Sequence, residues 1–142
     1  MPVREVAPLL PCARGEAVER FRCAWTTAGG EVAWGRLTGD VDIDSLRRLE
    51  RALREPEAQA PLVVLDLRGV RSLDGAAVHV IGRAAAWARH SRRRLIALRG
   101  PPRVERAFRA SAAGDEVERF ALDAGVPAVL VLLQLARPEG AG

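Results

Sequence analysis

Two aspartates are positioned to cap the helix that follows each of them. Asp42 and Asp74 each stand between an apolar segment and a segment with helical periodicity. A carboxylate in this position accepts hydrogen bonds from the free N–H groups of the first helical turn. Asp44 and Ser45 are rival caps for the first of these helices. Capping is compatible with a second role in shaping a binding surface, and the residues alone leave both roles open.

Motifs for catalysis and metal binding are missing from the sequence. It has no Gly-x-Ser-x-Gly elbow, no Gly-x-x-x-x-Gly-Lys loop, no paired-histidine zinc motif and no tyrosine. Cys12 and Cys23 form neither a CxxC pair nor a cluster with His79 and His90, so we expect reduced thiols. Asp66 lies in an apolar strand that could raise its pKa, but one carboxylate without a partner base makes no active site. We predict a non-enzymatic protein without catalytic residues, metal or cofactor.

Alternation and turn residues predict a hairpin at the start of the domain. Phe21, Cys23 and Trp25 alternate with Arg22, Ala24 and Thr26, which is typical of a half-buried strand. Residues 28–31 supply a glycine-rich turn, and a second strand is expected over 32–37. Residues 38–42 are expected to break that strand before the first helix.

Helices and strands are then expected in alternation. The first helix has an inner stripe of Leu46, Leu49 and Leu53 and ends at Glu55-Pro56. An apolar run over 62–67 predicts a central strand, followed by a loop over 68–73. The later elements are a second helix with Trp87 at its edge, a short strand over 95–98 and a third helix after Gly100-Pro101-Pro102. The residues expected to be inside these helices are Val78, Ile81, Ala85 and Ala88 in the second, and Val104, Ala107 and Phe108 in the third.

This order predicts an α/β fold with a mixed sheet of about four to five strands, packed against about four α-helices. The run over 126–136 is interpreted as a buried terminal helix, because it falls well short of the ~20 residues that span a membrane. At 142 residues the chain fits one domain, which we expect over 18–137, between a flexible N-terminal segment (1–17) and a flexible tail (138–142).

Charge and composition limit the partners. The formal net charge is +4 and all 22 basic side chains are arginine. The arginines are spread over several segments and have no interleaved aromatics, so no direct nucleic-acid binding is expected. Salt-sensitive nucleic-acid binding remains a weaker hypothesis. The N-terminus has no apolar stretch of signal-peptide length, so we expect a cytoplasmic protein without membrane insertion.

Local motifs within this order resemble those of a known family. Residues 39–42 (Gly-Asp-Val-Asp), directly before a helix, resemble the turn of STAS domains, and residues 63–70 with 72–78 resemble that family's central strand and switch loop. The resemblance runs from about Phe21 to Phe120 and is to the anti-sigma-factor-antagonist kind. It implies the STAS fold and a partner-binding surface formed by Asp42, Asp74, Gly75, Ala76, Ala77 and Val78.

The switch loop departs from the family pattern. Antagonists of this kind carry Asp-Ser-Ser/Thr-Gly-Leu, where a GHKL-type serine kinase phosphorylates a hydroxyl. Here the five positions are Asp74, Gly75, Ala76, Ala77 and Val78, so both hydroxyl positions are empty. A phosphate would add nearly two negative charges beside Asp42 and Asp74. The usual control cannot act at 75 or 76, and Ser72 is left as a possible displaced phosphoacceptor or a local hydrogen-bonding group.

The resemblance implies two functions of different classes. In the first, the chain binds an anti-sigma factor or a GHKL-type serine kinase and so controls sigma-factor-dependent transcription. In the second, it is a structural subunit, either among other STAS proteins in a multiprotein scaffold or in a lipid-transport ABC complex.

Overall fold

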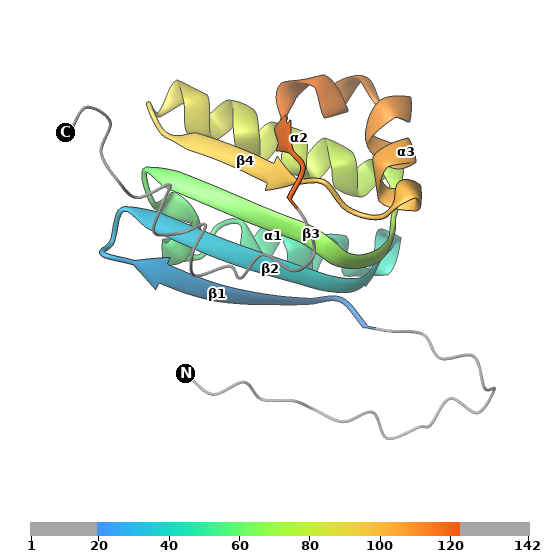
Figure 1. Cartoon of the computed structure of the whole chain (residues 1–142), viewed down its shortest axis with the longest axis horizontal. Helices are drawn as coiled ribbons and strands as arrows, with labels where there is room; N and C mark the ends of the chain where they lie inside the picture. The colour runs from blue at the N-terminus through green and yellow to red at the C-terminus, as the bar shows by residue number, and fades with distance from the viewer. Residues whose placement is uncertain (1–19, 123–142) are drawn as a thin grey trace.

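The computed structural model describes residues 20–122, which form a five-stranded sheet with three α-helices (Figure 1). The strands are β1 (Arg22–Ala28), β2 (Val32–Val41), β3 (Leu62–Leu73), β4 (Arg94–Leu98) and β5 (Glu118–Phe120). The α-helices are α1 (Leu46–Ala52), α2 (Gly75–His90) and α3 (Pro102–Ala110), with 3₁₀ turns η1 (Ile43–Ser45), η2 (Pro56–Gln59) and η3 (Ala112–Glu116).

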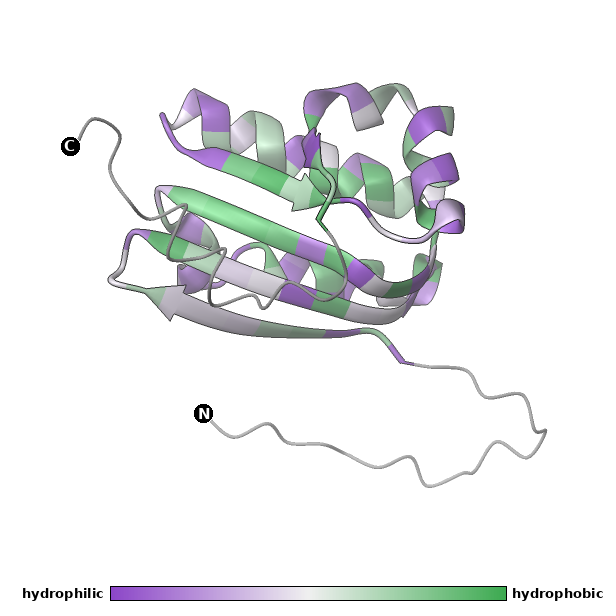
Figure 2. Cartoon of the chain, viewed as in Figure 1, coloured by the Kyte–Doolittle hydropathy of each residue, from purple (hydrophilic) through white to green (hydrophobic). Residues whose placement is uncertain are grey.

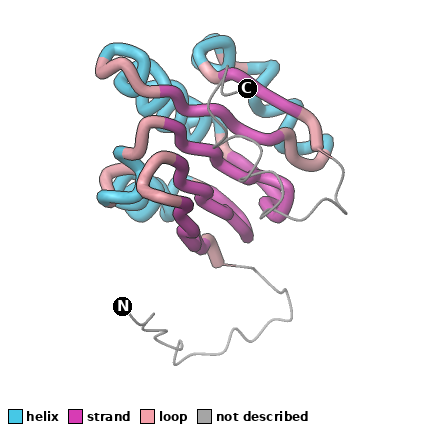
Figure 3. The backbone as a smooth tube through the Cα atoms, turned by 60° about the vertical axis from the view of Figure 1, so that its left-hand side comes forward, coloured by secondary structure: helices cyan, strands magenta, loops and turns pink. Residues whose placement is uncertain are grey.

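The strands lie in the sheet in chain order, from β1 to β5. Figure 3 shows them side by side in one sheet. β1 and β2 are antiparallel, joined by a turn in which Gly29 and Gly30 have positive φ, and all later pairs are parallel. The predicted mixed α/β sheet opened by a hairpin is therefore confirmed. The helix expected over 126–136 and both end segments lie outside the described residues.

All three helices pack on one face of the sheet, behind the strands in Figure 1. The predicted inner stripe of α2 is confirmed, since all four of its residues are buried, as are Leu49 and Leu53 beside α1. Trp34, Val64 and Ile96 belong to a second apolar cluster on the opposite face. Both faces of the central strands are thus apolar, which explains the continuous hydrophobic stretches along β3 and β4 in Figure 2. No helix among residues 20–122 is long and apolar enough to cross a bilayer.

Two strands are longer than the sequence predicts. β2 continues through the expected break to Val41, and β3 continues through the expected loop to Leu73. The two extensions pair with each other, with register shifts on either side of Thr38-Gly39. Gly39 has a φ of +91°, which glycine adopts without the strain that other residues incur. This pairing satisfies backbone groups on the facing sides of both extensions, so strands form in place of the expected break and loop.

One side chain of α2 lies differently from the prediction. Trp87 was expected at the edge of the apolar stripe, but it is 61 % exposed. Its ring stacks on His90, with centroids 6.3 Å apart. His79 also lies exposed on the helix surface, which is one of the two positions expected for it.

Candidate functional site

The ends of β2 and β3 bring two strand-to-helix junctions together. Val41 pairs with Leu73 in the parallel ladder, and the Asp74 N–H donates to the Val41 carbonyl at 2.9 Å. The chain leaves β2 through Asp42 into η1 and α1, and it leaves β3 through Asp74 into α2. The sequence positions that we expected to cooperate therefore meet at one edge of the sheet.

Both aspartates act as caps. The Asp42 carboxylate accepts from the Asp44 N–H at 3.1 Å, from the Ser45 N–H at 3.2 Å and from the Ser45 hydroxyl at 3.0 Å. Among the three candidates for the first cap, Asp42 is therefore the one used, and Ser45 is a buried partner. The Asp74 carboxylate accepts from the Ala76 N–H at 3.0 Å. Each carboxylate stabilises its turn and stays exposed, so its charge is available to a partner.

The first turn of α2 divides into accessible and buried residues. Gly75 is exposed, and the place of an added Cβ there has no other atom within 4 Å. Ala76 is half-buried, whereas Ala77 and Val78 are 0 % exposed and belong to the core. A partner at this surface reaches the first two side-chain positions, while the last two hold the helix onto the sheet.

Ile43 is a neighbour that the sequence reasoning missed. It is 65 % exposed, although isoleucine is among the residues most often buried. It follows the Asp42 cap directly and lies three residues before Leu46, so its spacing resembles that of a core position. The sequence signal was an apolar residue between two aspartates at a capping turn. We call the set Asp42, Ile43, Asp44, Asp74, Gly75 and Ala76 the junction surface.

Ser72 lies in β3 and not in a loop. Its hydroxyl donates to the Asp40 carboxylate at 2.7 Å, across the pair that Asp40 and Ser72 form in the ladder. Arg71 lies 3.9 Å from the same carboxylate. A phosphate on Ser72 would remove this hydrogen bond and set two negative groups side by side.

The pKa of Asp66 is shifted opposite to the sequence expectation. Burial disfavours the charged carboxylate, but hydrogen bonds from Arg68, the charge of Arg68 and a bond from Trp34 outweigh it, so the pKa is lowered. The Arg68 guanidinium donates to both carboxylate oxygens at 2.9 Å, and the Trp34 indole N–H donates at 3.2 Å. The group is a structural ion pair and lacks the raised pKa of a catalytic acid.

The arrangement as a whole suits binding. Between residues 20 and 122, no three His, Cys, Asp or Glu side chains come together to hold a metal ion. Cys23 is a free thiol. The junction surface combines one exposed apolar side chain with three exposed carboxylates, and this combination can anchor a partner and select basic groups.

Comparisons with known proteins agree with the fold. The family model STAS_2, described as "Mlab, STAS domain", matches residues 30–136. No curated protein matches the chain. An anti-sigma factor antagonist from Mycobacterium paratuberculosis has a similar structure, with a TM-score of 0.65 and 15 % identity over 84 % of this chain and 96 % of that one. The unphosphorylated anti-sigma factor antagonist SpoIIAA aligns with a TM-score of 0.64 and 13 % identity, over 83 % of this chain and 100 % of that one. At these identities the two structures share the fold.

Proposed function

We propose that this chain, which belongs to the non-enzymatic STAS_2 family of STAS domains, is a regulatory module that binds another protein through the junction surface. The observation that carries the proposal is the exposed Ile43, which directly follows the Asp42 cap. Two residues before it, the Val41 carbonyl accepts from the Asp74 N–H at the start of α2, where Asp74 forms the second cap. We propose a domain over 18–137, and the family match at 30–136 falls within it.

Binding at this surface is proposed to be independent of phosphorylation at its usual place. Positions 75 and 76 are glycine and alanine and carry no hydroxyl. The surface already holds the carboxylates of Asp42, Asp44 and Asp74, so a phosphate there would face like charges. Without an acceptor, this repulsion cannot be switched on, and the surface stays in its binding state.

The leading partner is an anti-sigma factor or a GHKL-type serine kinase, through which the chain would control sigma-factor-dependent transcription. Solved structures named as anti-sigma factor antagonists share its fold, which supports this class of partner. With a partner of this class, we propose a cytoplasmic location for the chain.

The second candidate is a structural subunit of a multiprotein scaffold or of a lipid-transport ABC complex. It is favoured by the family description, which names Mlab and no antagonist. This candidate also requires no phosphoacceptor. Co-purification with a membrane permease, or recovery in a defined high-mass assembly, would distinguish it from the first.

The test of the binding surface compares two exposed apolar residues. The purified chain is titrated against the anti-sigma kinases of its own genome as wild type, Ile43→Asp and Phe120→Asp. Phe120 is 43 % exposed and lies on the edge strand β5, which is separated from β3 by β4. We expect Ile43→Asp to weaken binding about tenfold, corresponding to the loss of one buried apolar side chain, and Phe120→Asp to have no effect. Equal affinities for the two variants would contradict the proposed surface.

The test of the missing acceptor adds a hydroxyl back. With a switch kinase and ATP, we expect no phosphate on the wild-type chain and phosphorylation of Gly75→Ser or Ala76→Ser. The space around Gly75 admits a serine side chain. Phosphopeptide mapping reads the result, and phosphate on Ser72 of the wild type would show that the acceptor has moved instead of being lost.

A further inference from the structure

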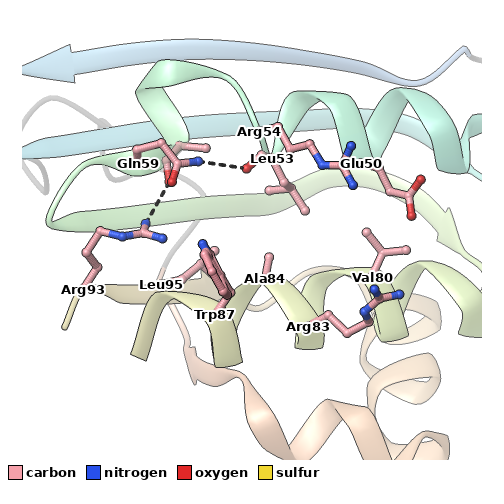
Figure 4. A pocket seen from close by; sticks show the side chains of 11 residues that line it. Glu50, Leu53, Arg54, Gln59, Val80, Arg83, Ala84, Trp87, Arg93 and Leu95 are labelled. Carbon is pink, nitrogen blue, oxygen red and sulfur yellow. Dashed lines mark hydrogen bonds between the residues drawn. The ribbon is translucent and has the colours of Figure 1, made fainter. Parts of the chain in front are cut away.

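A hollow of about 490 Å³ lies between α1 and α2, away from the junction surface (Figure 4). Its size is within the range of small-molecule sites. α1 and the residues that end it supply one wall, α2 the other, and β4 with η2 closes the far end. The lining residues are Glu50, Leu53, Arg54, Ala58, Gln59, Val80, Arg83, Ala84, Trp87, Arg93 and Leu95.

The inner surface of this groove is apolar. Val80, Ala84 and Trp87 recur on one face of α2, opposite Leu53 and beside Leu95 (Figure 4). Trp87 is among the few large apolar side chains that stay exposed in the described part of the chain. An exposed indole next to an apolar hollow offers a flat contact for a ligand.

The charge around the groove is mostly positive. Three arginines line it, with Glu50 as the single carboxylate. Arg93 is fixed at the η2 end, where its guanidinium donates to the Ala58 carbonyl at 3.2 Å. The side chains of Arg54 and Arg83 project from opposite walls (Figure 4), and neither guanidinium forms a hydrogen bond or ion pair with any residue of the described range. Unpaired guanidinium groups beside an apolar floor favour an occupant that carries an anion.

We infer that this groove binds an amphiphilic anion: a compact apolar or aromatic body with a carboxylate, phosphate or sulfonate head. The body lies against Trp87 and the floor residues Leu53 and Ala84, and the head lies between Arg54 and Arg83. This is a second site, independent of the protein-binding function proposed for the junction surface.

Two fluorescent probes test the inference, because they differ mainly in charge. 8-Anilinonaphthalene-1-sulfonate carries the anionic head, and N-phenyl-1-naphthylamine has a similar aromatic body without it. Each is titrated into the full chain and into three variants: Arg54→Gln/Arg83→Gln, Trp87→Ala, and a control with equal charge loss, Arg47→Gln/Arg106→Gln. The control arginines lie exposed on α1 and α3. Circular dichroism verifies that every variant is folded.

We expect one saturable site for the sulfonate. The groove double variant should lower its affinity about fivefold or more, as two lost exposed ion pairs would, and should leave the neutral probe within about twofold. Trp87→Ala should weaken both probes, and the control variant neither. The inference is overturned if the groove and control variants bind the sulfonate equally, or if Trp87→Ala leaves both affinities unchanged.

Discussion

Replacing Asp66 with asparagine is expected to destabilise the fold by about 2–3 kcal/mol at pH 7. The side chain is 4 % exposed near the centre of β3, and it bonds both Trp34 and Arg68. Asparagine has nearly the same shape, so packing is preserved and the change acts on charge and hydrogen bonds alone.

The magnitude follows from the contacts of the carboxylate. It accepts from the Arg68 backbone N–H at 3.0 Å, from two guanidinium nitrogens at 2.9 Å and from the Trp34 indole at 3.2 Å. A hydrogen bond to a charged group contributes about 1.5–3 kcal/mol. Asparagine retains one acceptor oxygen and turns a donor toward the others. The Arg68 side chain is 20 % exposed, so the freed cation still reaches water, which keeps the loss below the cost of a fully buried unpaired charge.

The pH dependence has a definite sign. The pKa of Asp66 is lowered in the folded state, so the unfolded chain takes up the proton first as the pH falls. Its stabilising contribution is complete above the ordinary carboxyl pKa of about 3.9 and is lost as the pH falls through the folded value. Wild type should therefore lose stability on acidification more steeply than Asp66→Asn below about pH 4.

Urea unfolding at a series of pH values, followed by tryptophan fluorescence, measures both effects. Glu118→Gln is the matched control, because Glu118 forms an exposed ion pair with Arg94 at 2.8 Å and should lose at most about 1 kcal/mol. The reasoning is refuted if Asp66→Asn is no more destabilising than Glu118→Gln, or if wild type and Asp66→Asn respond equally to acid.

Three further predictions concern stability and reactivity. Gly35→Ala should destabilise the chain by about 1–3 kcal/mol, because the added Cβ would lie 2.8 Å from the Trp25 ring. An unchanged midpoint in thermal or urea unfolding would contradict this prediction. The pKa of Cys23 is raised to about 12 by burial and then by the charges of two nearby glutamates. In a Cys12→Ser background, its thiol should therefore react slowly with iodoacetamide at pH 8 in the folded chain and quickly in urea. Equal reaction rates in the folded and unfolded chain would contradict the raised pKa. Ser72→Ala should lose about 1 kcal/mol with its 2.7 Å hydrogen bond, and a neutral result in urea unfolding would show that the bond is unimportant.

The elements that depend on local pattern could be predicted from the sequence. Leu46, Leu49 and Leu53 mark a helix because their spacing needs no knowledge of the rest of the chain. The far ends of β2 and β3 could not be predicted in this way. Gly39 and Asp40 have turn chemistry in isolation. Only pairing with a distant segment, as between Asp40 and Ser72, 32 residues apart, makes them part of a strand.

In the candidate site, too, the residues with local contacts could be predicted and those with long-range contacts could not. Asp42 and Asp74 were identifiable because a cap bonds to backbone two or three residues ahead. The exposure of Ile43 depends on where the packed face of α1 ends, which spacing does not reveal. The pKa direction of Asp66 depends in part on Trp34, 32 residues away in the sequence, although Arg68, two residues on, was a visible signal.

The order of strands has a consequence for synthesis on the ribosome. Every described strand pairs with the strand that precedes it in the chain, so each new segment docks onto an edge that has already emerged. The hairpin of β1 and β2 is available first, and each later helix and strand extends it without displacing an earlier pairing. We therefore expect vectorial folding, in which the sheet grows from its N-terminal edge during translation and β5 is the last described strand to join.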